Sequence, residues 1–337
     1  DADRFAELIW AIQAVVNRQG PIYPDRRAGF FDILTAAALI AFKRASTDVS
    51  ILEAGLGGRL DATTVVTPGV TCITSIELEH TDKLGNTLAA IAEEKAAVIR
   101  PGVDVVVGRL PPEALAVVSR VADQREAPCH RLGIEIDCVA QARGAFHQDL
   151  MIGFQDRSAR ALLPVPGKHM ADNAALALTA SWLLDAPMGA GEAGAGALCG
   201  INLPGRLQRL RSSPLILVDA AHTGASAAGL AAVLDQIQAH PLHLVLSFSA
   251  ERNLDTVLRT LLPHADQVTV TRADRLRSLE AERVAARIRS LEPGLPTRVR
   301  HDPVEALRSA LAEMSPRGAL CVAGSTYLAG VAQAALA

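Results

Sequence analysis

Short apolar runs alternate along the chain with segments whose apolar residues recur at helical spacing. The runs Thr71–Ile76 and Val103–Val107 predict buried strands. After each of them, Ala89–Ile99 and Pro112–Gln124 show the three- and four-residue spacing of amphipathic helices. This order is typical of β-α-β units, so we predict a mostly parallel sheet.

A second series of strand-like runs begins near Pro204. Its members are Leu215–Ala220, Leu242–Phe248, Gln267–Thr271, Thr297–Arg300 and Leu320–Ala323. Between the two series, apolar and polar residues alternate in short stretches of residues 129–165, a pattern typical of antiparallel hairpins. The following segment Ala171–Leu184 has a strong helical pattern. We therefore predict an α/β fold with two domains, residues 1–203 and residues 204–337.

Composition and charge narrow the range of functions. The 33 basic and 36 acidic residues leave a net charge of −3, which argues against nucleic acid or an anionic membrane as a partner. No run of apolar residues is long enough to predict a membrane span. The five cysteines have no metal-binding spacing, and we expect a reducing, cytoplasmic location.

The most informative stretch follows the apolar run Val49–Leu56, which we predict to be a buried strand. The run carries the carboxylate of Glu53, and a glycine-rich turn and Asp61 come next. Ligands bind at the carboxyl ends of strands in open α/β sheets. A carboxylate beside glycine backbone, which a ligand can approach closely, suits a divalent cation that is bound together with a phosphate. A dinucleotide fingerprint does not fit, because Leu60 stands where G-x-G-x-x-G needs glycine. A purely structural turn is the alternative.

Two further polar positions accompany this turn. His80 follows the predicted strand Thr71–Ile76 and is therefore expected at the same sheet edge, although a single histidine is more often a packing or surface residue. Lys95 has Ile91 and Ile99 four residues before and after it, so the usual Glu–Lys helix pair is absent.

Together these segments resemble the folylpolyglutamate synthase/dihydrofolate synthase family of the Mur ligase superfamily. The string E-x-G-L-G-G-R-x-D-x-T-x-V-V at Glu53–Val66 carries the resemblance most specifically. Further matches follow in the family's order at Gly29–Thr35, Gly167–Asn173, Pro204–Leu207, Leu217–His222 and Ala323–Tyr327. The resemblance implies a central ATPase-like parallel-sheet domain, incomplete at its N-terminus, followed by a Rossmann-like C-terminal domain.

The resemblance also implies an activity. The family uses ATP to phosphorylate the carboxylate of dihydropteroate or of a folylpolyglutamate, and the amine of L-glutamate then attacks the acyl phosphate as ADP is released. Such phosphoryl transfer needs Mg²⁺ to neutralise charge. ATP and Mg²⁺ are therefore the expected cofactors, small molecules the expected partners, and a monomer the expected state.

Residue by residue, the resemblance assigns roles to ten positions. Glu53 and His80 match magnesium ligands. Lys95 matches a lysine that is carbamylated in the family and serves as a metal ligand and catalytic group. The remaining matches are Leu60, Asp61 and Ala62 for the pterin substrate, Asn173, Arg206 and Asp219 for ATP, and His222 for catalysis. Each of the last four positions has a structural alternative. Asn173 is then a helix cap and Arg206 a surface arginine. Asp219 is then a turn residue at a strand end, and His222 a residue that precedes a helix.

One family element has no counterpart. The family carries a phosphate-binding loop near its start, and no G-x-x-x-x-G-K-[ST] string occurs in the 337 residues. We therefore expect the N-terminal part of the first domain to be missing. The alternatives are a truncated or degenerate relative without ATPase activity that acts as a binding module, or a peptidoglycan-type Mur ligase. The turn at Gly57–Asp61 favours the folate branch.

Overall fold

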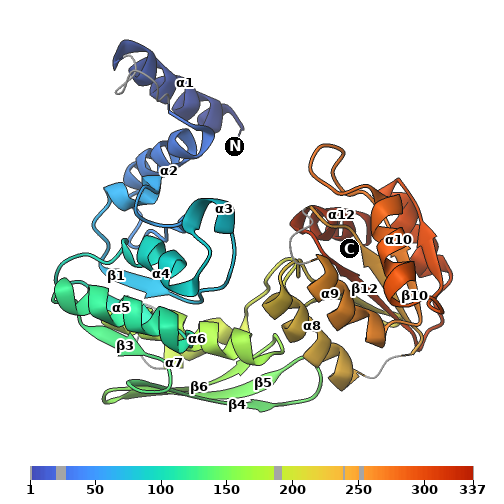
Figure 1. The fold of residues 1–337 in the computed structure, drawn as a ribbon. Coiled ribbons are helices and arrows are strands. Elements are labelled where there is room, and N and C mark those ends of the chain that lie inside the picture. Colours follow the sequence, from blue (N-terminus) through green and yellow to red (C-terminus); the bar gives the residue numbers. More distant parts are fainter. Residues whose placement is uncertain (1, 20–27, 186–191, 238–239, 250–253, 337) are drawn as a thin grey trace. The chain divides into compact units, whose positions relative to one another are not determined.

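The fold is α/β, as predicted. The computed structural model describes residues 2–19, 28–185, 192–237, 240–249 and 254–336 (Figure 1). The chain forms two compact units: residues 1–137, 154–156 and 175–190 make unit 1, and residues 138–153, 157–174 and 191–337 make unit 2. The domain boundary near residue 203 stays a prediction.

Unit 1 is built on a small parallel sheet of order β1-β2-β3. The strands are β1 (Val70–Ile73), β2 (Asp104–Val107) and β3 (Cys129–Arg131), and the helices that pack with them are α4 (Leu88–Ala96) and α5 (Pro112–Gln124). In α5 the buried Ala114, Val118, Val121 and Ala122 lie at helical spacing, and this apolar stripe faces the core. The strands and helices predicted for this region are confirmed.

The predicted strand at Val49–Leu56 is wrong. These residues belong to no strand, and the Ile51 side chain is 87% exposed. A strand needs a neighbour for its backbone hydrogen bonds. In the described chain β1 is the edge of its sheet, and no segment pairs with residues 49–56.

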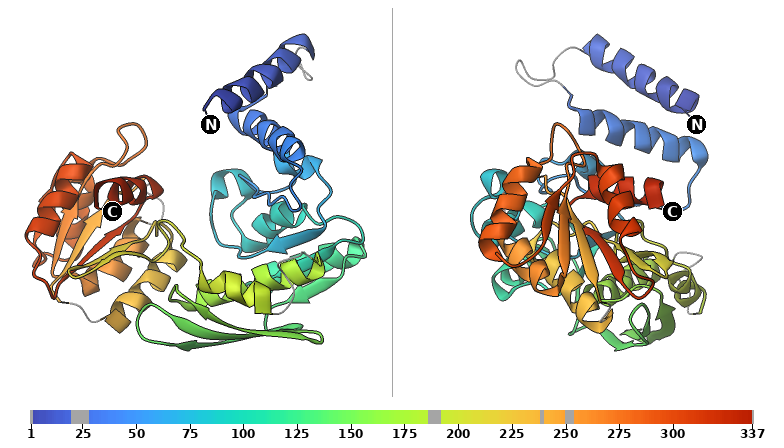
Figure 2. Two further views of the ribbon diagram at one scale, coloured as in Figure 1. Left: turned by 180° about the vertical axis from the view of Figure 1, so that it is seen from behind. Right: turned by 90° about the vertical axis from the view of Figure 1, so that its right-hand side faces the viewer.

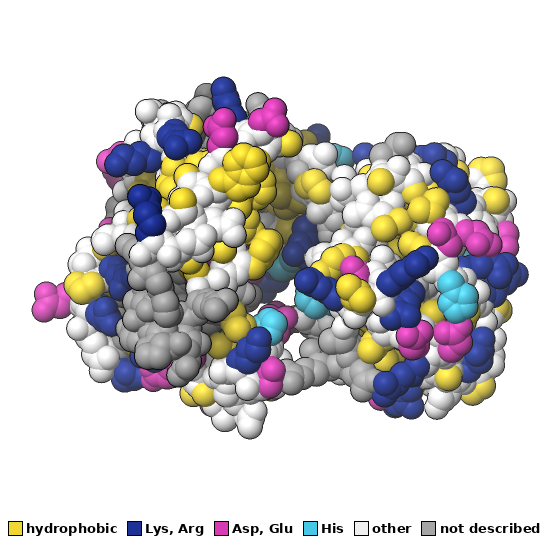
Figure 3. All heavy atoms as spheres, turned by 90° about the horizontal axis from the view of Figure 1, so that it is seen from above, with side chains coloured by type: hydrophobic (Ala, Val, Ile, Leu, Met, Phe, Trp, Pro, Cys, Tyr) yellow, Lys and Arg dark blue, Asp and Glu magenta, His cyan; other side chains and the backbone are white. Residues whose placement is uncertain are grey.

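Two helices that we did not predict precede this segment. They are α1 (Ala2–Gln19) and α2 (Phe30–Ala45), which pack together through Leu8, Ile12 and Ala37. Unit 1 also exposes large apolar side chains, among them Trp10, Phe30, Ile51 and Leu60. Hydrophobic side chains gather on the surface shown in Figure 3. No helix of the described residues is long and apolar enough to cross a membrane.

Unit 2 contains a six-stranded sheet of order β11-β10-β9-β12-β8-β7, parallel except for β7. Its strands are β7 (Gln208–Ser212), β8 (Leu215–Val218), β9 (Leu242–Leu246), β10 (Gln267–Val270), β11 (Thr297–Val299) and β12 (Ala319–Ala323). The central strands β8, β9 and β12 are buried along their whole length, as strands covered on both faces must be. The five predicted strands of this series are confirmed, and β7 is an addition.

Helices flank this sheet (Figure 2). They are α8 (Gly224–Ile237), α9 (Leu254–Leu261), α10 (Ala281–Leu291), α11 (Pro303–Ala312) and α12 (Thr326–Leu336). Alternate side chains of β8 and β12, such as Ile216 and Leu320, join the core that α11 and α12 cover.

A second, three-stranded sheet has the order β4-β5-β6. Its strands are β4 (Ile136–Ala142), β5 (Gln148–Phe154) and β6 (Arg157–Leu163), and α6 (Lys168–Leu183) and α7 (Glu192–Cys199) follow. Consecutive strands are neighbours here, as the hairpins expected for residues 129–165 require, but β3 at the start of that stretch pairs in parallel with β2, so the prediction is wrong there. The Gln148 side chain donates to the carbonyls of Val165 and Gly167, and these bonds hold the chain where it enters α6.

A buried histidine in β9 makes the stability of unit 2 depend on pH. The Gln267 amide donates to Nδ1 of His243, which in turn donates from Nε2 to Thr269, so the ring is neutral. Burial lowers the pKa of His243 to about 4. The unfolded chain binds the proton more readily, so this stabilisation is complete above about pH 6.5 and is lost as the pH falls toward 4.

We expect the free energy of unfolding of the protein to fall by about 3 kcal/mol from this group between pH 7 and pH 4. Urea unfolding of the protein and of His243→Gln across that range measures the effect. The variant has no ring to titrate and should lose less stability on acidification. Identical pH profiles for the two proteins would show that His243 does not contribute.

Candidate functional site

The glycine-rich turn of unit 1 is organised by Asp61. Its Oδ2 accepts from the backbone N–H groups of Gly55 (2.8 Å) and Leu56 (3.2 Å), and its Oδ1 accepts from the backbone (3.0 Å) and hydroxyl (2.6 Å) of Thr63. The residue is only 8% exposed. Burial alone would raise the pKa of Asp61, but these hydrogen bonds outweigh it and the pKa is lowered, so the carboxylate is charged at neutral pH.

The same turn packs against α4. The Arg59 backbone N–H donates to the carbonyl of Glu94 (3.1 Å), and the Arg59 side chain pairs with the Glu94 carboxylate (2.9 Å). Gly58 fits closely, since a Cβ there would lie 2.8 Å from the Glu94 carbonyl oxygen and 3.0 Å from that of Lys95. The turn therefore covers carbonyl groups in the last turn of α4, where helices lack internal donors.

The three proposed metal ligands lie on segments that meet at this turn. Glu53 enters it, Lys95 belongs to α4, and His80 begins the short helix α3 (Thr81–Leu84), whose Leu84 contacts the turn. Glu53 and His80 are exposed and Lys95 is partly buried. His80 also adopts a left-handed backbone, with φ 50°, a conformation often found at functional sites.

These donors fit a divalent cation in their chemistry. A carboxylate and an imidazole can bind a metal directly, whereas an ammonium group cannot, so Lys95 would have to be a carbamate. Within the described residues no three His, Cys, Asp or Glu side chains form a group that could hold a metal ion. Of the predicted substrate contacts, Leu60 is 75% exposed and Ala62 is partly buried.

Unit 2 holds a second group of polar residues, centred on Asp219. This buried carboxylate follows β8 and accepts from the backbone N–H groups of Leu207 and Ala221, both at 2.7 Å. Leu207 has a left-handed backbone (φ 46°), which the bond to Asp219 holds in place. The preceding residue, Arg206, is exposed. Burial raises the pKa of Asp219 and outweighs the opposing effects of these two bonds, of Arg206 and of His222.

His222 lies just before α8. Its Nδ1 is 2.9 Å from the carbonyl oxygen of Ala220, which can only accept, so Nδ1 carries a proton and the lone pair of the neutral ring is on Nε2. Thr223 and Ser226 exchange hydrogen bonds at the first turn of α8, in the manner of a helix cap. His222 is thus an exposed acceptor beside a capped helix start.

The helix α6 supplies Asn173 and a residue that we did not predict. The helix begins at Lys168, so the exposed Asn173 is well inside it and is not its cap. His169 packs against glycines, because a Cβ on Gly229 would lie 3.0 Å from its ring. This burial lowers the pKa of His169, and the charge of Arg206 lowers it further against the opposing effect of Asp172. In the sequence, the string Gly167-Lys-His was the signal that pointed to His169.

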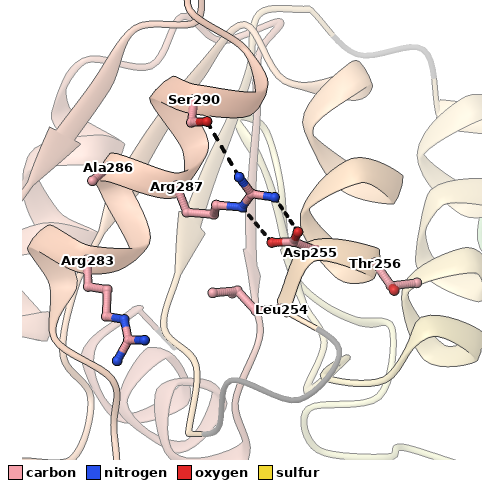
Figure 4. A pocket seen from close by; sticks show the side chains of 7 residues that line it. All are labelled: Leu254, Asp255, Thr256, Arg283, Ala286, Arg287 and Ser290. Atoms are coloured by element: carbon pink, nitrogen blue, oxygen red, sulfur yellow. Dashed lines mark hydrogen bonds and ion pairs between the residues drawn. The ribbon is translucent and has the colours of Figure 1, made fainter.

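Unit 2 also has two cavities that lie away from the polar residues around Asp219. One of about 550 Å³ lies between α9 and α10, where the guanidinium of Arg287 pairs with Asp255 at 2.6 Å and Arg283 and Ser290 line the wall (Figure 4). The other, of about 720 Å³, lies over the β4-β5-β6 sheet beside α7. Neither contains a predicted site residue.

Comparisons with known proteins identify relatives of this chain. Residues 205–326 match the family model described as the Mur ligase glutamate ligase domain. The dihydrofolate synthase/folylpolyglutamate synthase of Mycobacterium tuberculosis is 35% identical over 288 residues, 81% of this chain. The Escherichia coli protein of the same name is 37% identical over 193 residues, 57% of this chain. The chain is similar to the folylpolyglutamate synthase/dihydrofolate synthase family over most of its length.

Solved structures extend the likeness to nearly the whole chain. The M. tuberculosis folylpolyglutamate synthase complexed with ADP and AMPPCP covers 98% of it, with a TM-score of 0.85 and 29% identity, and the chain covers 78% of that structure. E. coli FolC in complex with DHPP and ADP covers 92%, with a TM-score of 0.81 and 27% identity, and the chain covers 72% of it. The chain spans 58% of the M. tuberculosis relative's length in sequence and 43% of the E. coli relative's.

Proposed function

We propose that the protein is an ATP-dependent, ADP-forming ligase that adds L-glutamate to dihydropteroate, to folylpolyglutamates or to both. The observation that carries the proposal is the likeness, over 98% of the chain, to a folylpolyglutamate synthase described as complexed with ADP and AMPPCP. We further propose that it acts as a monomer in the cytoplasm on small-molecule substrates.

In unit 1, Glu53, His80 and carbamylated Lys95 would hold Mg²⁺. The ion, when bound, would neutralise charge on the transferring phosphoryl group. The exposed, apolar side chain of Leu60 offers a surface to the flat pterin, and Asp61 and Ala62 follow it in the sequence.

In unit 2, Arg206 is suited to the phosphates of ATP, because a guanidinium donates two parallel hydrogen bonds to phosphate oxygens. Asp219 fixes the backbone next to Arg206 through the Leu207 N–H. Asn173 is the third proposed nucleotide contact. In its neutral form His222 has the lone pair on Nε2, which can accept a proton from an amine such as that of glutamate.

The direct test is ADP release that depends on L-glutamate, with ATP, Mg²⁺ and dihydropteroate, on the chain and on any longer form that its reading frame encodes. We expect Arg206→Gln to reduce the rate on the order of 100-fold, since it removes a phosphate donor that acts during phosphoryl transfer. Arg211→Gln, at an exposed position in the same region, is the matched control and should keep the rate. No glutamate-dependent release by any folded form would reject the proposal.

Two alternatives are separable by experiment. A peptidoglycan-type acceptor is not favoured, because the relatives are folate enzymes, and an acceptor panel tests it directly. A binding module without ATPase activity is motivated by the missing G-x-x-x-x-G-K-[ST] string. It would bind folates in calorimetry but release no ADP.

A further inference from the structure

The carboxylate of Asp61 has no free hydrogen-bonding capacity. Each of its two oxygens already accepts two hydrogen bonds, from Gly55 and Leu56 on one side and from the backbone and hydroxyl of Thr63 on the other. A carboxylate oxygen offers about two lone-pair sites. The side chain is also nearly inaccessible, at 8% exposure. A substrate would have to displace one of these four bonds to reach it.

The bonds to Asp61 close a loop whose other side rests on α4. Gly55 and Leu56 enter the turn and Thr63 follows it, so Asp61 ties its two ends together. Between these ends, Arg59 binds the Glu94 carbonyl, and Gly58 lies against the carbonyl oxygens of Glu94 and Lys95. The turn therefore contacts the C-terminal end of α4 through both of these residues.

We infer that Asp61 is a positioning residue rather than a substrate ligand: it fixes the glycine-rich turn so that Leu60 is presented to the acceptor and the helix turn with Lys95 is held in place. The inference deepens the proposed function, because it assigns acceptor contact to the exposed Leu60 and the role of a clamp to the buried Asp61. Leu60 lies next to Asp61 in sequence but is 75% exposed.

Amide hydrogen exchange tests the clamp without reference to activity. In Asp61→Asn one oxygen becomes an NH₂ group, which sets a donor against the donors of either Gly55 and Leu56 or Thr63. We expect peptides that cover residues 55–63 to exchange at least 10-fold faster than in the wild-type protein, with a smaller increase at residues 94–98. Peptides from α5 should be unchanged. Exchange at residues 55–63 equal to wild type would overturn the inference.

Two further variants complete the test. Thr63→Val removes only the hydroxyl donor, and we expect exchange at residues 55–63 to rise 2- to 5-fold. If Asp61→Asn does not fold, an unchanged exchange rate in Thr63→Val overturns the inference instead. Leu60→Ala should leave exchange at wild-type rates and weaken the binding of dihydropteroate, measured by calorimetry.

The binding measurements separate this inference from the proposed function. If Asp61→Asn abolished dihydropteroate binding at wild-type exchange rates, Asp61 would be a direct ligand and the inference wrong. If the wild-type protein bound no dihydropteroate and released no ADP, the proposed function would fail, while the exchange data would still decide whether Asp61 clamps the turn.

Discussion

Replacing Gly58 with alanine is expected to destabilise unit 1 by about 1–3 kcal/mol and to reduce ligase turnover on the order of 100-fold. The new Cβ would lie 2.7 Å from a methyl carbon of Val98, 2.8 Å from the Glu94 carbonyl oxygen and 3.0 Å from that of Lys95. Two of these atoms are helix backbone and cannot rotate away, so the turn itself must lift. Urea unfolding and the glutamate-dependent ADP release assay measure the two effects.

Gly330→Ala is the control for the substitution itself. Gly330 lies inside α12 and a Cβ there meets no atom within 4 Å. Alanine should stabilise that helix by about 0.5–1 kcal/mol, because glycine loses more backbone entropy on folding. Wild-type stability and turnover in Gly58→Ala would show that the turn does not rest on α4 as the structure has it.

The fold could be predicted wherever the chain supplies both partners of a contact. Apolar runs such as Leu215–Ala220 become central strands because neighbours on both sides bury them. The run Val49–Leu56 has the same apolar character but no pairing neighbour among the described residues, and local pattern cannot reveal that. Strand β7 was missed for the opposite reason. Four of the five residues of Gln208–Ser212 are polar, so the segment lacks an apolar run, and its antiparallel pairing with β8 makes it a strand.

The candidate site, like the fold, could be predicted only in part from the sequence. Residue identity and order were enough to single out Glu53–Val66 and the positions near Arg206. The sequence pattern did not show which groups each of these side chains contacts. Both Asp61 and Asp219 were predicted as ligand contacts, and the structure shows that their oxygens accept backbone N–H groups. Such bonds depend on turn geometry, which a motif string does not specify.

Glu53→Gln is expected to lower turnover on the order of 100-fold or more while leaving the fold intact. The side chain is exposed, so an amide of the same size disturbs no packing. A neutral amide is a weaker ligand than a carboxylate for a hard cation, and a metal site loses charge neutralisation when a carboxylate is removed. The measurement is ADP release as a function of Mg²⁺ concentration, in which the variant should need more Mg²⁺ than the wild-type protein.

The control for this prediction is Glu113→Gln, which removes the same charge from an exposed position in the first turn of α5. Its Mg²⁺ requirement and turnover should match the wild type. Binding of Mn²⁺, followed by its effect on water proton relaxation, gives a readout that does not depend on turnover. If Glu53→Gln kept both its Mn²⁺ affinity and its turnover, Glu53 would not be a ligand. Since the turn that Glu53 enters would remain clamped by Asp61, that result would assign the glycine-rich segment to acceptor binding alone and leave the metal to other residues.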